Sequence, residues 1–292
     1  MRYYAYYPGC AMETTGVPIQ MSIDSVAKVL DFELEEIDDW TCCGCPGESI
    51  NELAAAALAA RNLALAEKTG LDVVVPCSCC YRNLMSAHVI YNQDPRIKAQ
   101  VASALKTVNL EYKGTVRLRT LIDVLVNDIG LDVISSKVKT KLSGLKVASY
   151  YGCHQSRPYG PDDHEFPQWQ DWIAESLGAE PVFYPLKAQC CGGAQLFSQR
   201  DMVYKLLFKI LDNVERHGGQ CISSTLCPLC FTNLDVNQGR IKKRSGGKFA
   251  MPILATTQLM GIAFGLDPKE LGLHKNISPV YKVLSPYMRV KV

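Results

Sequence analysis

The chain has 292 residues, of which 48% are hydrophobic and 21% charged, as in an ordinary globular protein with a full core. Its net charge of +2 and lack of long basic runs argue against nucleic-acid binding. The most apolar stretch, residues 53–60, is too short for a transmembrane helix, and the first residues do not predict a secretory signal. Thirteen cysteines without an export signal predict a cytoplasmic protein whose cysteines bind metal or do redox work.

The first half of the chain predicts alternating strands and helices, with cysteines after each strand. Strands are expected at 3–7, 32–37 and 72–76, and helices at 23–30, 51–68 and 82–91. The strand at 72–76 is apolar on both faces, which is typical of a parallel sheet. Cys10 follows the first strand, Cys42 and Cys43 the second, and Cys77 the third.

Residues 95–142 predict a mainly helical connection, after which the same scheme returns. Strands are expected at 145–150, 181–184 and 221–225, and helices at 169–177 and 202–216. The tail after Gly265 contains three prolines, so we expect it to be irregular and to dock on a neighbouring chain.

These elements predict an α/β protein with two similar lobes, each βαβαβ with a parallel sheet, related by a pseudo-twofold internal duplication. We place the domains at 1–142 (with the connection) and 143–292 (with the tail). Ligands bind outside the carboxyl ends of strands in such sheets, so the three cysteine groups of each lobe are expected to converge there.

The cysteines repeat one pattern: a single cysteine after glycine, a pair before glycine, and a C-x-x-C that leads into aromatic-x-Asn-Leu. The first set is Cys10, Cys42, Cys43, Cys77 and Cys80, and the second is Cys153, Cys190, Cys191, Cys227 and Cys230. Matching positions differ by 143, 148 and 150 residues (10 to 153, 42 to 190, 77 to 227).

Three cysteines fall outside the repeat. Cys221 aligns with Leu71, and we expect it to be a buried core residue. Cys45 and Cys79 align with Gly193 and Leu229, and they lie beside the first set in the sequence, where a supporting or a reactive role is open. Cys79 also competes with Cys77 as a ligand, and the match to Cys227 favours Cys77.

Five cysteines per lobe predict an iron–sulfur cluster. A zinc ion takes four ligands, and the side chains of adjacent cysteines diverge, which makes a pair awkward for one ion. Five thiolates also exceed the four of an ordinary cluster, so an extended cluster with several iron atoms is favoured. Zinc in at least one lobe and a purely structural role are the alternatives.

The motifs Gly-Cys-His-x-x-Arg-Pro at 152–158 and Cys-Pro-Leu-Cys-x-x-Asn-Leu-Asp at 227–235 resemble the CCG domains of the heterodisulfide reductase B-subunit family. The resemblance covers nearly the whole chain. It implies two noncubane [4Fe-4S] clusters, each held by one of the two sets of five cysteines. The extra Cys45 and Cys79 depart from the simple motif.

The family also implies a reaction and partners. The implied substrate is a disulfide between the clusters, in methanogens that of coenzymes M and B, with each cluster supplying one electron. The chain shows no dinucleotide fingerprint or P-loop. Electrons therefore come from another polypeptide. The family implies a ferredoxin-like C subunit as direct partner and, one step further away, a flavin-containing A subunit.

His154 and Arg157, which follow Cys153, have no counterparts after Cys10 in the first lobe. We expect His154 to deliver a proton to a thiolate, since its unperturbed pKa is about 6.5. Arg157 is expected to pair with a carboxylate or phosphate of an anionic thiol. The structural alternatives are a hydrogen-bonded loop histidine and an arginine that ties the loop down. Lys187 is a weaker candidate, and His164 is expected to be exposed.

Other functions stay open. Within the family, the alternative is a complex that reduces another disulfide or oxidises protein-bound sulfur. A different class is an electron-transfer module of a flavin dehydrogenase that oxidises glycolate or succinate. Such modules usually carry a ferredoxin-like domain in the same chain, and the absence of a four-cysteine ferredoxin run here argues against this class.

Overall fold

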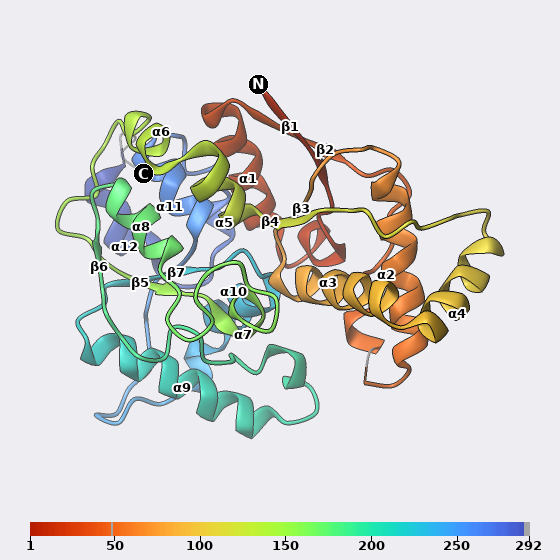
Figure 1. Cartoon of the computed structure of the whole chain (residues 1–292). Helices are drawn as coiled ribbons and strands as arrows, with labels where there is room; N and C mark the ends of the chain where they lie inside the picture. The colour runs from red at the N-terminus through yellow and green to blue at the C-terminus, as the bar shows by residue number, and fades with distance from the viewer. Residues whose placement is uncertain (48, 289–292) are drawn as a thin grey trace.

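The computed structural model describes residues 1–47 and 49–288 and contains two four-stranded parallel sheets (Figure 1). The first sheet has the order β2-β1-β3-β4 and the second the order β6-β5-β7-β8. The strands are β1 (Arg2–Tyr6), β2 (Phe32–Glu36), β3 (Val73–Val75), β4 (Leu118–Thr120), β5 (Lys146–Tyr150), β6 (Glu180–Pro181), β7 (Cys221–Ser224) and β8 (Ile253–Ala255). Each lobe therefore places its strands in the same order, and the predicted α/β fold with two similar lobes is confirmed.

The helices of the first lobe lie on both sides of its sheet. They are α1 (Val17–Leu30), α2 (Glu52–Glu67), α3 (Ser78–Gln93) and α4 (Pro95–Lys106). In Figure 1, α2, α3 and α4 pack together on one side, and α1 lies on the other. Asn51 caps α2 by accepting a hydrogen bond from the Ala54 amide at 3.0 Å, and Asp94 caps α4 in the same way at Arg96.

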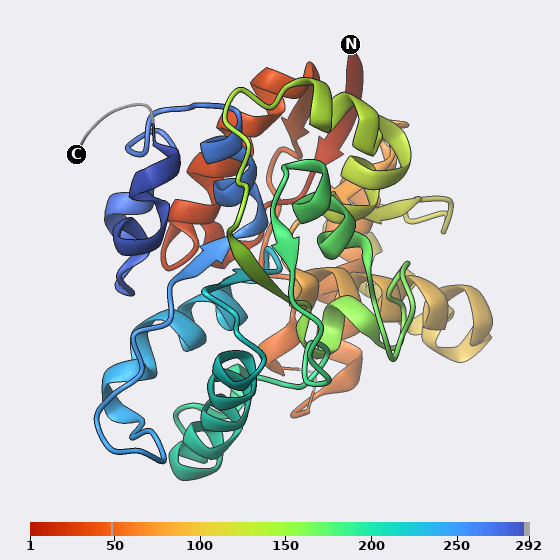
Figure 2. The same ribbon diagram turned by 90° about the vertical axis from the view of Figure 1, so that its left-hand side faces the viewer.

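The second lobe repeats this arrangement with one long helix, α9, and several short ones (Figure 2). They are α7 (Gly152–Ser156), α8 (Trp169–Ser176), α9 (Arg200–Arg216), α10 (Pro228–Val236), α11 (Thr256–Ala263) and α12 (Val280–Leu284). The connection contains α5 (Leu121–Asp123), the π-helical turn η3 (Val124–Ile129) and α6 (Leu131–Ser136). Short 3-10 helices are η1 (Cys10–Glu13), η2 (Cys45–Gly47), η4 (Gly193–Gln195), η5 (Asn237–Arg240), η6 (Leu273–Lys275) and η7 (Ser285–Tyr287).

Each sheet has a fourth strand where three were expected. β4 lies in the connection that was predicted to be mainly helical, and β8 follows Pro252. Both strands have only three residues, and β4 contains the buried Arg119, whose charge hides the strand from a hydrophobic pattern. The Arg119 guanidinium forms an ion pair with Asp123 and a second one, at 3.1 Å, with Asp128.

The helices that follow the fourth strands lock the two lobes together. α11, after β8, contacts α1 of the first lobe, and the hydroxyls of Ser22 and Thr257 meet there at 2.6 Å. In return α5 and α6, after β4, contact α8 of the second lobe. The boundary between 142 and 143 stays a prediction. Within the connection, α4 packs on α2 and α3 of the first lobe, whereas α5 and α6 pack on α8 of the second lobe (Figure 1).

The described part of the tail packs on its own chain, and its docking on a neighbour stays a prediction. Leu273, Val280 and Leu284 are buried in the same core as the strands. The Asp235 carboxylate accepts hydrogen bonds from the amides of Ile277 at 2.7 Å and Ser278 at 2.8 Å. The motif residue Asp235 therefore anchors the C-terminal segment to α10.

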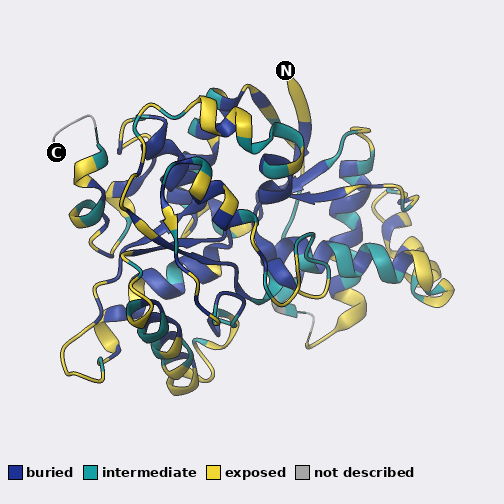
Figure 3. Ribbon diagram, turned by 60° about the vertical axis from the view of Figure 1, so that its left-hand side comes forward, coloured by how far each residue is buried: buried dark blue, intermediate teal, exposed yellow. Residues whose placement is uncertain are grey.

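Most residues of the two sheets are buried, whereas exposed residues gather on the outer helices such as α4 and α9 (Figure 3). Sheets covered on both faces account for the apolar runs along β3 and β8. No helix in the described ranges has the length and apolar character needed to cross a bilayer.

Candidate functional site

In each lobe, the five cysteines of the repeat lie beyond the carboxyl ends of three neighbouring strands. In the first sheet the strand order β2-β1-β3 brings the loops with Cys42, Cys10 and Cys77 side by side. In the second sheet β6-β5-β7 does the same for the matching cysteines. The chain reverses its direction of winding between β1 and β3, and such switch points are where open parallel sheets bind ligands.

The thiols of each set contact one another. In the first lobe, Cys43 interacts with Cys42 and with Cys80, and Cys77 interacts with Cys80. Cys10 lies near Cys42 at the exposed side of the set. The three groups of the first lobe, far apart in the sequence, therefore meet in space.

The second lobe repeats these contacts. The Sγ atoms of Cys191 and Cys230 are 3.5 Å apart, and Cys153 interacts with Cys190. Cys227 interacts with Cys230, as Cys77 does with Cys80 in the first lobe. Five thiols thus converge in each lobe.

These contacts shift the acidity of the thiols. A hydrogen bond from Cys42 lowers the pKa of Cys43 to about 4, and one from Cys153 lowers the pKa of Cys190 to about 6. Hydrogen bonds from Cys230 and Cys77 lower the pKa of Cys227. The same contacts raise the pKa of the partner thiols Cys42, Cys153 and Cys230. A metal takes thiolates, so its binding would release the protons that these thiols hold.

Glycines before the single cysteines allow the close approach of another thiol. Gly9 has φ +81°, and a Cβ atom there would lie 2.9 Å from the Sγ atom of Cys80. Gly152 has φ +68°, and its Cβ atom would lie 3.1 Å from the Sγ atom of Cys230. Any side chain at either position would push a motif thiol out of its set.

Two tyrosines hold the loop that precedes each cysteine pair. The Tyr7 hydroxyl donates to the Thr41 carbonyl at 2.6 Å, and the Tyr150 hydroxyl donates to the Gln189 carbonyl at 2.6 Å. Burial, together with the neighbouring thiols, raises the pKa of both hydroxyls, so each one keeps its proton and remains a donor.

Two asparagines hold the pair itself. The Asn83 side-chain amide donates to the Cys43 carbonyl, and that of Asn233 donates to the Cys191 carbonyl at 2.8 Å. Sequence reasoning assigned no role to these residues or to the two tyrosines. The signal was present in the duplication, since aromatic-x-Asn-Leu recurs after both C-x-x-C motifs.

Each set has an open and a closed side. The single cysteine and the first of the pair are exposed or half-buried: Cys10, Cys42, Cys153 and Cys190. The other six motif cysteines are buried. A group bound by either set would therefore meet solvent or a partner on the same side in both lobes.

The two sets adjoin each other at the contact between the lobes. α3, which carries the first C-x-x-C motif, contacts α7, and α10, which carries the second, contacts η1. Cys77 interacts with Cys227 across this contact, and the Ser78 hydroxyl donates to Gln155 at 2.9 Å. Each lobe thus supports the other lobe's ligand loops.

The residues outside the repeat occupy distinct places. Cys221 is fully buried at the start of β7, as expected, and burial raises its pKa to about 12.

The backbone of Cys77 matches that of its counterpart in the second lobe. Cys77 and Cys227 precede α3 and α10 with nearly the same backbone angles, φ −71° and −77° with ψ 113° in both. Cys79 instead faces Cys45.

The candidate catalytic residues lie on the loop after Cys153. His154 is half-buried on α7, beside that cysteine. The Arg157 side chain is 47% exposed, and its guanidinium pairs with Glu165 at 2.9 Å. His164 is exposed, as expected.

Lys187 has a structural role. Its ammonium is buried in an ion pair with Asp171 and donates to the Pro167 carbonyl at 2.9 Å. Its own carbonyl accepts hydrogen bonds from the amides of Tyr151 at 2.8 Å and Gly152 at 3.1 Å. The residue therefore positions the turn before Cys153.

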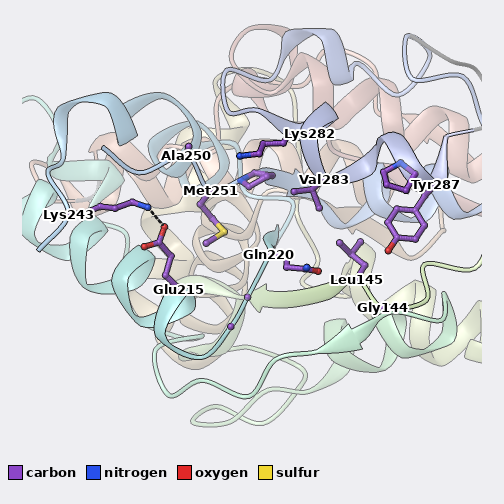
Figure 4. Close-up of a pocket in the computed structure, with 14 residues that line it drawn as sticks. Gly144, Leu145, Glu215, Gln220, Lys243, Ala250, Met251, Lys282, Val283 and Tyr287 are labelled. Carbon is purple, nitrogen blue, oxygen red and sulfur yellow. Dashed lines mark ion pairs between the residues drawn. The ribbon is translucent and has the colours of Figure 1, made fainter. Parts of the chain in front are cut away.

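A cavity of about 570 Å³ lies at the opposite edge of the second sheet (Figure 4). Its lining includes Leu145 and Gln220, which precede β5 and β7, and the ion pair of Lys243 with Glu215 at 2.6 Å. The cysteines follow the other ends of these strands. The cavity is therefore separate from the cysteine sets.

The donor sets suit a cluster better than a single ion. Among the described residues, no three cysteine, histidine, aspartate or glutamate side chains are placed to hold one metal ion. Every donor in the two sets is sulfur, and thiolates select soft metals and iron–sulfur clusters. Five thiols on three loops match a group with several metal atoms.

The CCG family, described as the cysteine-rich domain, matches residues 4–85 and 147–235. The chain belongs to this family. It carries the CCG domain twice, once in each lobe, and the predicted duplication is confirmed.

Relatives match the CCG protein over nearly its full length. The 8-methylmenaquinol:fumarate reductase membrane anchor subunit of Wolinella succinogenes is 34% identical over 96% of this chain and 98% of that protein. The B subunit of the ferredoxin/F(420)H(2)-dependent CoB-CoM heterodisulfide reductase of Methanosarcina acetivorans is 31% identical over 92% of both chains. The B subunit of the ferredoxin:CoB-CoM heterodisulfide reductase of Methanosarcina mazei is 31% identical over 94% of both. The predicted resemblance to heterodisulfide reductase B subunits is confirmed.

One solved structure has the same fold. A hypothetical protein from Helicobacter pylori superposes with a TM-score of 0.70 over 94% of this chain and 52% of that one, at 14% identity. At this identity the likeness concerns the fold alone.

Proposed function

We propose that this CCG protein is the iron–sulfur subunit of an oxidoreductase complex. Its ten motif cysteines would hold two noncubane [4Fe-4S] clusters, five cysteines for each. The observation that carries this proposal is the meeting of two all-thiol sets, which adjoin at Cys77 and Cys227. The choice of Cys77 over Cys79 as ligand rests on the same contact, because Cys79 faces Cys45 instead.

The proposed reaction is the reduction of a disulfide to two thiols, of the coenzyme M–coenzyme B type. It consumes two electrons and two protons, and iron–sulfur clusters supply electrons one at a time. Two adjacent sets account for both electrons. The relatives from Methanosarcina, which are named as B subunits of heterodisulfide reductases, support this substrate class and a place in methanogenesis.

Two residues of the second lobe would serve the substrate. His154 stands next to the half-exposed Cys153, where it can give a proton to a departing thiolate. The Arg157 guanidinium pairs with an exposed carboxylate, that of Glu165, and can exchange it for a carboxylate or phosphate of the substrate. Both roles are part of the proposal.

Electrons would reach the chain from other polypeptides of a cytoplasmic complex. We propose a ferredoxin-like C subunit as direct partner and, one step further away, a flavin-containing A subunit. The names of the relatives, which are subunits of reductases, support a multi-subunit assembly.

A second candidate is an electron-transfer subunit of a fumarate reductase. The observation that favours it is the 34% identity to the anchor subunit from Wolinella succinogenes. The lack of a four-cysteine ferredoxin motif in this sequence does not exclude this function, because the chain matches 98% of the length of that subunit without one. In this case the chain would pass electrons between a quinol and a flavin subunit.

Electron paramagnetic resonance of the reconstituted full chain separates the two functions. Under anaerobic conditions, added coenzyme M or coenzyme B thiol is expected to change the cluster signal, whereas a menaquinol analogue should leave it unchanged. A response to the quinol alone would favour the fumarate reductase function. Zinc without acid-labile sulfide in the purified protein would overturn both.

A further inference from the structure

Cys45 and Cys79 are two thiols beside the first set that the proposed function does not use. Cys45 begins η2, directly after Gly44, and Cys79 lies in the first turn of α3. η2 contacts α3, and the two thiols face each other. Cys45 is partly exposed and Cys79 is buried.

The second lobe gives an independent measure of the distance between the Cβ atoms at these two positions. Gly193 and Leu229 occupy the equivalent positions, at the same offsets of 148 and 150 residues as the motif cysteines (45 to 193, 79 to 229). A Cβ atom at Gly193 would lie 3.4 Å from the Cβ atom of Leu229. This separation is just below the range of about 3.5–4.5 Å between the Cβ atoms of a disulfide, so a small shift would bring the two positions to that geometry.

The two cysteines meet each other at the edge of the ligand set, where the Cys45 amide also donates to the Cys43 thiol. Cys77 and Cys80, on either side of Cys79 in the sequence, interact with each other, and Cys80 also interacts with Cys43. Cys79 has Cys45 as its thiol neighbour instead. We propose that Cys45 and Cys79 form a reversible disulfide next to the first set, a redox site that the second lobe lacks.

Thiol–disulfide exchange with a low-molecular-weight disulfide would form this bond. The thiolate of the more exposed Cys45 attacks one sulfur of the small disulfide, which releases one thiol and leaves a mixed disulfide on Cys45. The Cys79 thiol, after losing its proton, attacks the Cys45 sulfur and releases the second thiol. The small disulfide gains two electrons and two protons, and the two cysteines lose the same number.

The bond would tie the loop of the first cysteine pair to α3. A hydrogen bond from Asn83 of α3 to the Cys43 carbonyl already joins the same two segments. The disulfide would therefore add a covalent link beside the ligand set. Its reduced form, the two free thiols, would hold two electrons next to the proposed cluster, which transfers one electron at a time. This inference does not depend on whether the physiological acceptor is a disulfide or fumarate.

The experiment uses the anaerobically reconstituted full chain and oxidised glutathione as the probe. After incubation, free and bonded cysteines are mapped by differential alkylation and mass spectrometry. We expect one disulfide, Cys45–Cys79, that dithiothreitol reverses, with the iron and sulfide contents unchanged. Free Cys45 and Cys79, or pairing of Cys45 with Cys42 or Cys43, would overturn the proposal.

Matched variants test the exchange steps. In Cys79→Ser, we expect glutathione to stay attached to Cys45, since the resolving thiol is gone. In Cys45→Ser, the buried Cys79 should stay reduced, and Cys221→Ser should behave as the wild type. A disulfide that forms in Cys45→Ser between Cys79 and a motif cysteine would contradict the assignment.

The second lobe allows a gain-of-function test. The double variant Gly193→Cys/Leu229→Cys is expected to form an additional disulfide under the same conditions, which the mass spectrum reports directly. If both introduced thiols stay free, the equivalent positions do not have disulfide geometry and the argument from the duplication fails. The electron paramagnetic resonance response to coenzyme thiols is read separately, so the two proposals can fail independently.

Discussion

Asn83 and Asn233 make the same hydrogen bond in the two lobes, from a side-chain amide to the carbonyl of the second cysteine of the pair. Both asparagines are buried, and so are Cys43 and Cys191, whose carbonyls they satisfy. A lost bond leaves a buried acceptor without its partner, which costs about 1–3 kcal/mol. These residues therefore position the ligand loops.

Replacement of Asn83 by alanine is expected to loosen the first cysteine pair. We expect the variant to lose iron to a chelator several-fold faster from the first lobe, because its ligand loop is no longer held to α3. Asn92→Ala is the matched control, since Asn92 also lies on α3 but donates to the Gly114 carbonyl at its exposed end. Equal rates of iron loss in both variants would show that the amide does not position the loop.

A methyl group at Gly152 is expected to displace Cys230. Gly152→Ala adds both left-handed backbone strain, about 1–2 kcal/mol, and a contact with the thiol. Gly218→Ala has the same strain, at φ +80°, but meets no atom within 4 Å. We expect both variants to lower the melting temperature and only Gly152→Ala to lower the iron content. A normal iron content in Gly152→Ala would contradict the close approach.

At the scale of elements, β4 and η3 depend on one buried cation. The Arg119 side chain is 5% exposed and binds Asp123 and Asp128, and the Tyr4 hydroxyl donates to Asp128 at 2.7 Å. The fourth strand of the first sheet is thereby linked both to the helical turn that follows it and to β1.

Arg119→Leu is expected to destabilise the protein by about 3–5 kcal/mol, because it leaves the buried carboxylate of Asp123 without its partner. Arg117→Leu is the control. Arg117 pairs with Asp72 at 3.1 Å, but its side chain is 68% exposed, and an exposed pair contributes about 0–1 kcal/mol. Chemical denaturation measures both, and similar losses in the two variants would show that the Arg119 network is not specific.

At the scale of the molecule, the two lobes hold each other through reciprocal contacts. α11 packs on α1, and α5 and α6 pack on α8. The C-x-x-C helices α3 and α10 contact the elements after the single cysteines of the opposite lobe, α7 and η1. The ligand sets are therefore neighbours, although each set takes its donors from one lobe only.

Loss of one ligand set is expected to leave the other occupied. We expect Cys80→Ala and Cys230→Ala each to retain about half of the iron and acid-labile sulfide of the wild type, because each cluster has its own five thiolates. Cys221→Ala should retain all of it, since Cys221 is buried in the core. Iron and sulfide analysis measures this outcome, and complete loss in either single variant would mean that the two sets share ligands.

Periodicity predicted the regular elements well where they are long or apolar. The helix expected at 51–68 is α2, and the strand expected at 72–76 contains β3. β4 was missed because the charge of its buried Arg119 interrupts the apolar pattern. The helix expected from residue 82 begins at Ser78, since the C-x-x-C segment itself is helical.

The sequence by itself determined which cysteines form each set, because the duplicated spacing and the strand-end positions are local properties of the chain. The tertiary structure alone decided that Cys77 meets Cys227, that Cys79 faces Cys45, and that the tail docks on its own chain. Such contacts join residues that are far apart in the sequence. The contact of Cys77 with Cys227 depends on how the helices of one lobe pack on the other, and the other two depend on packing within a lobe. No local spacing encodes either kind of packing.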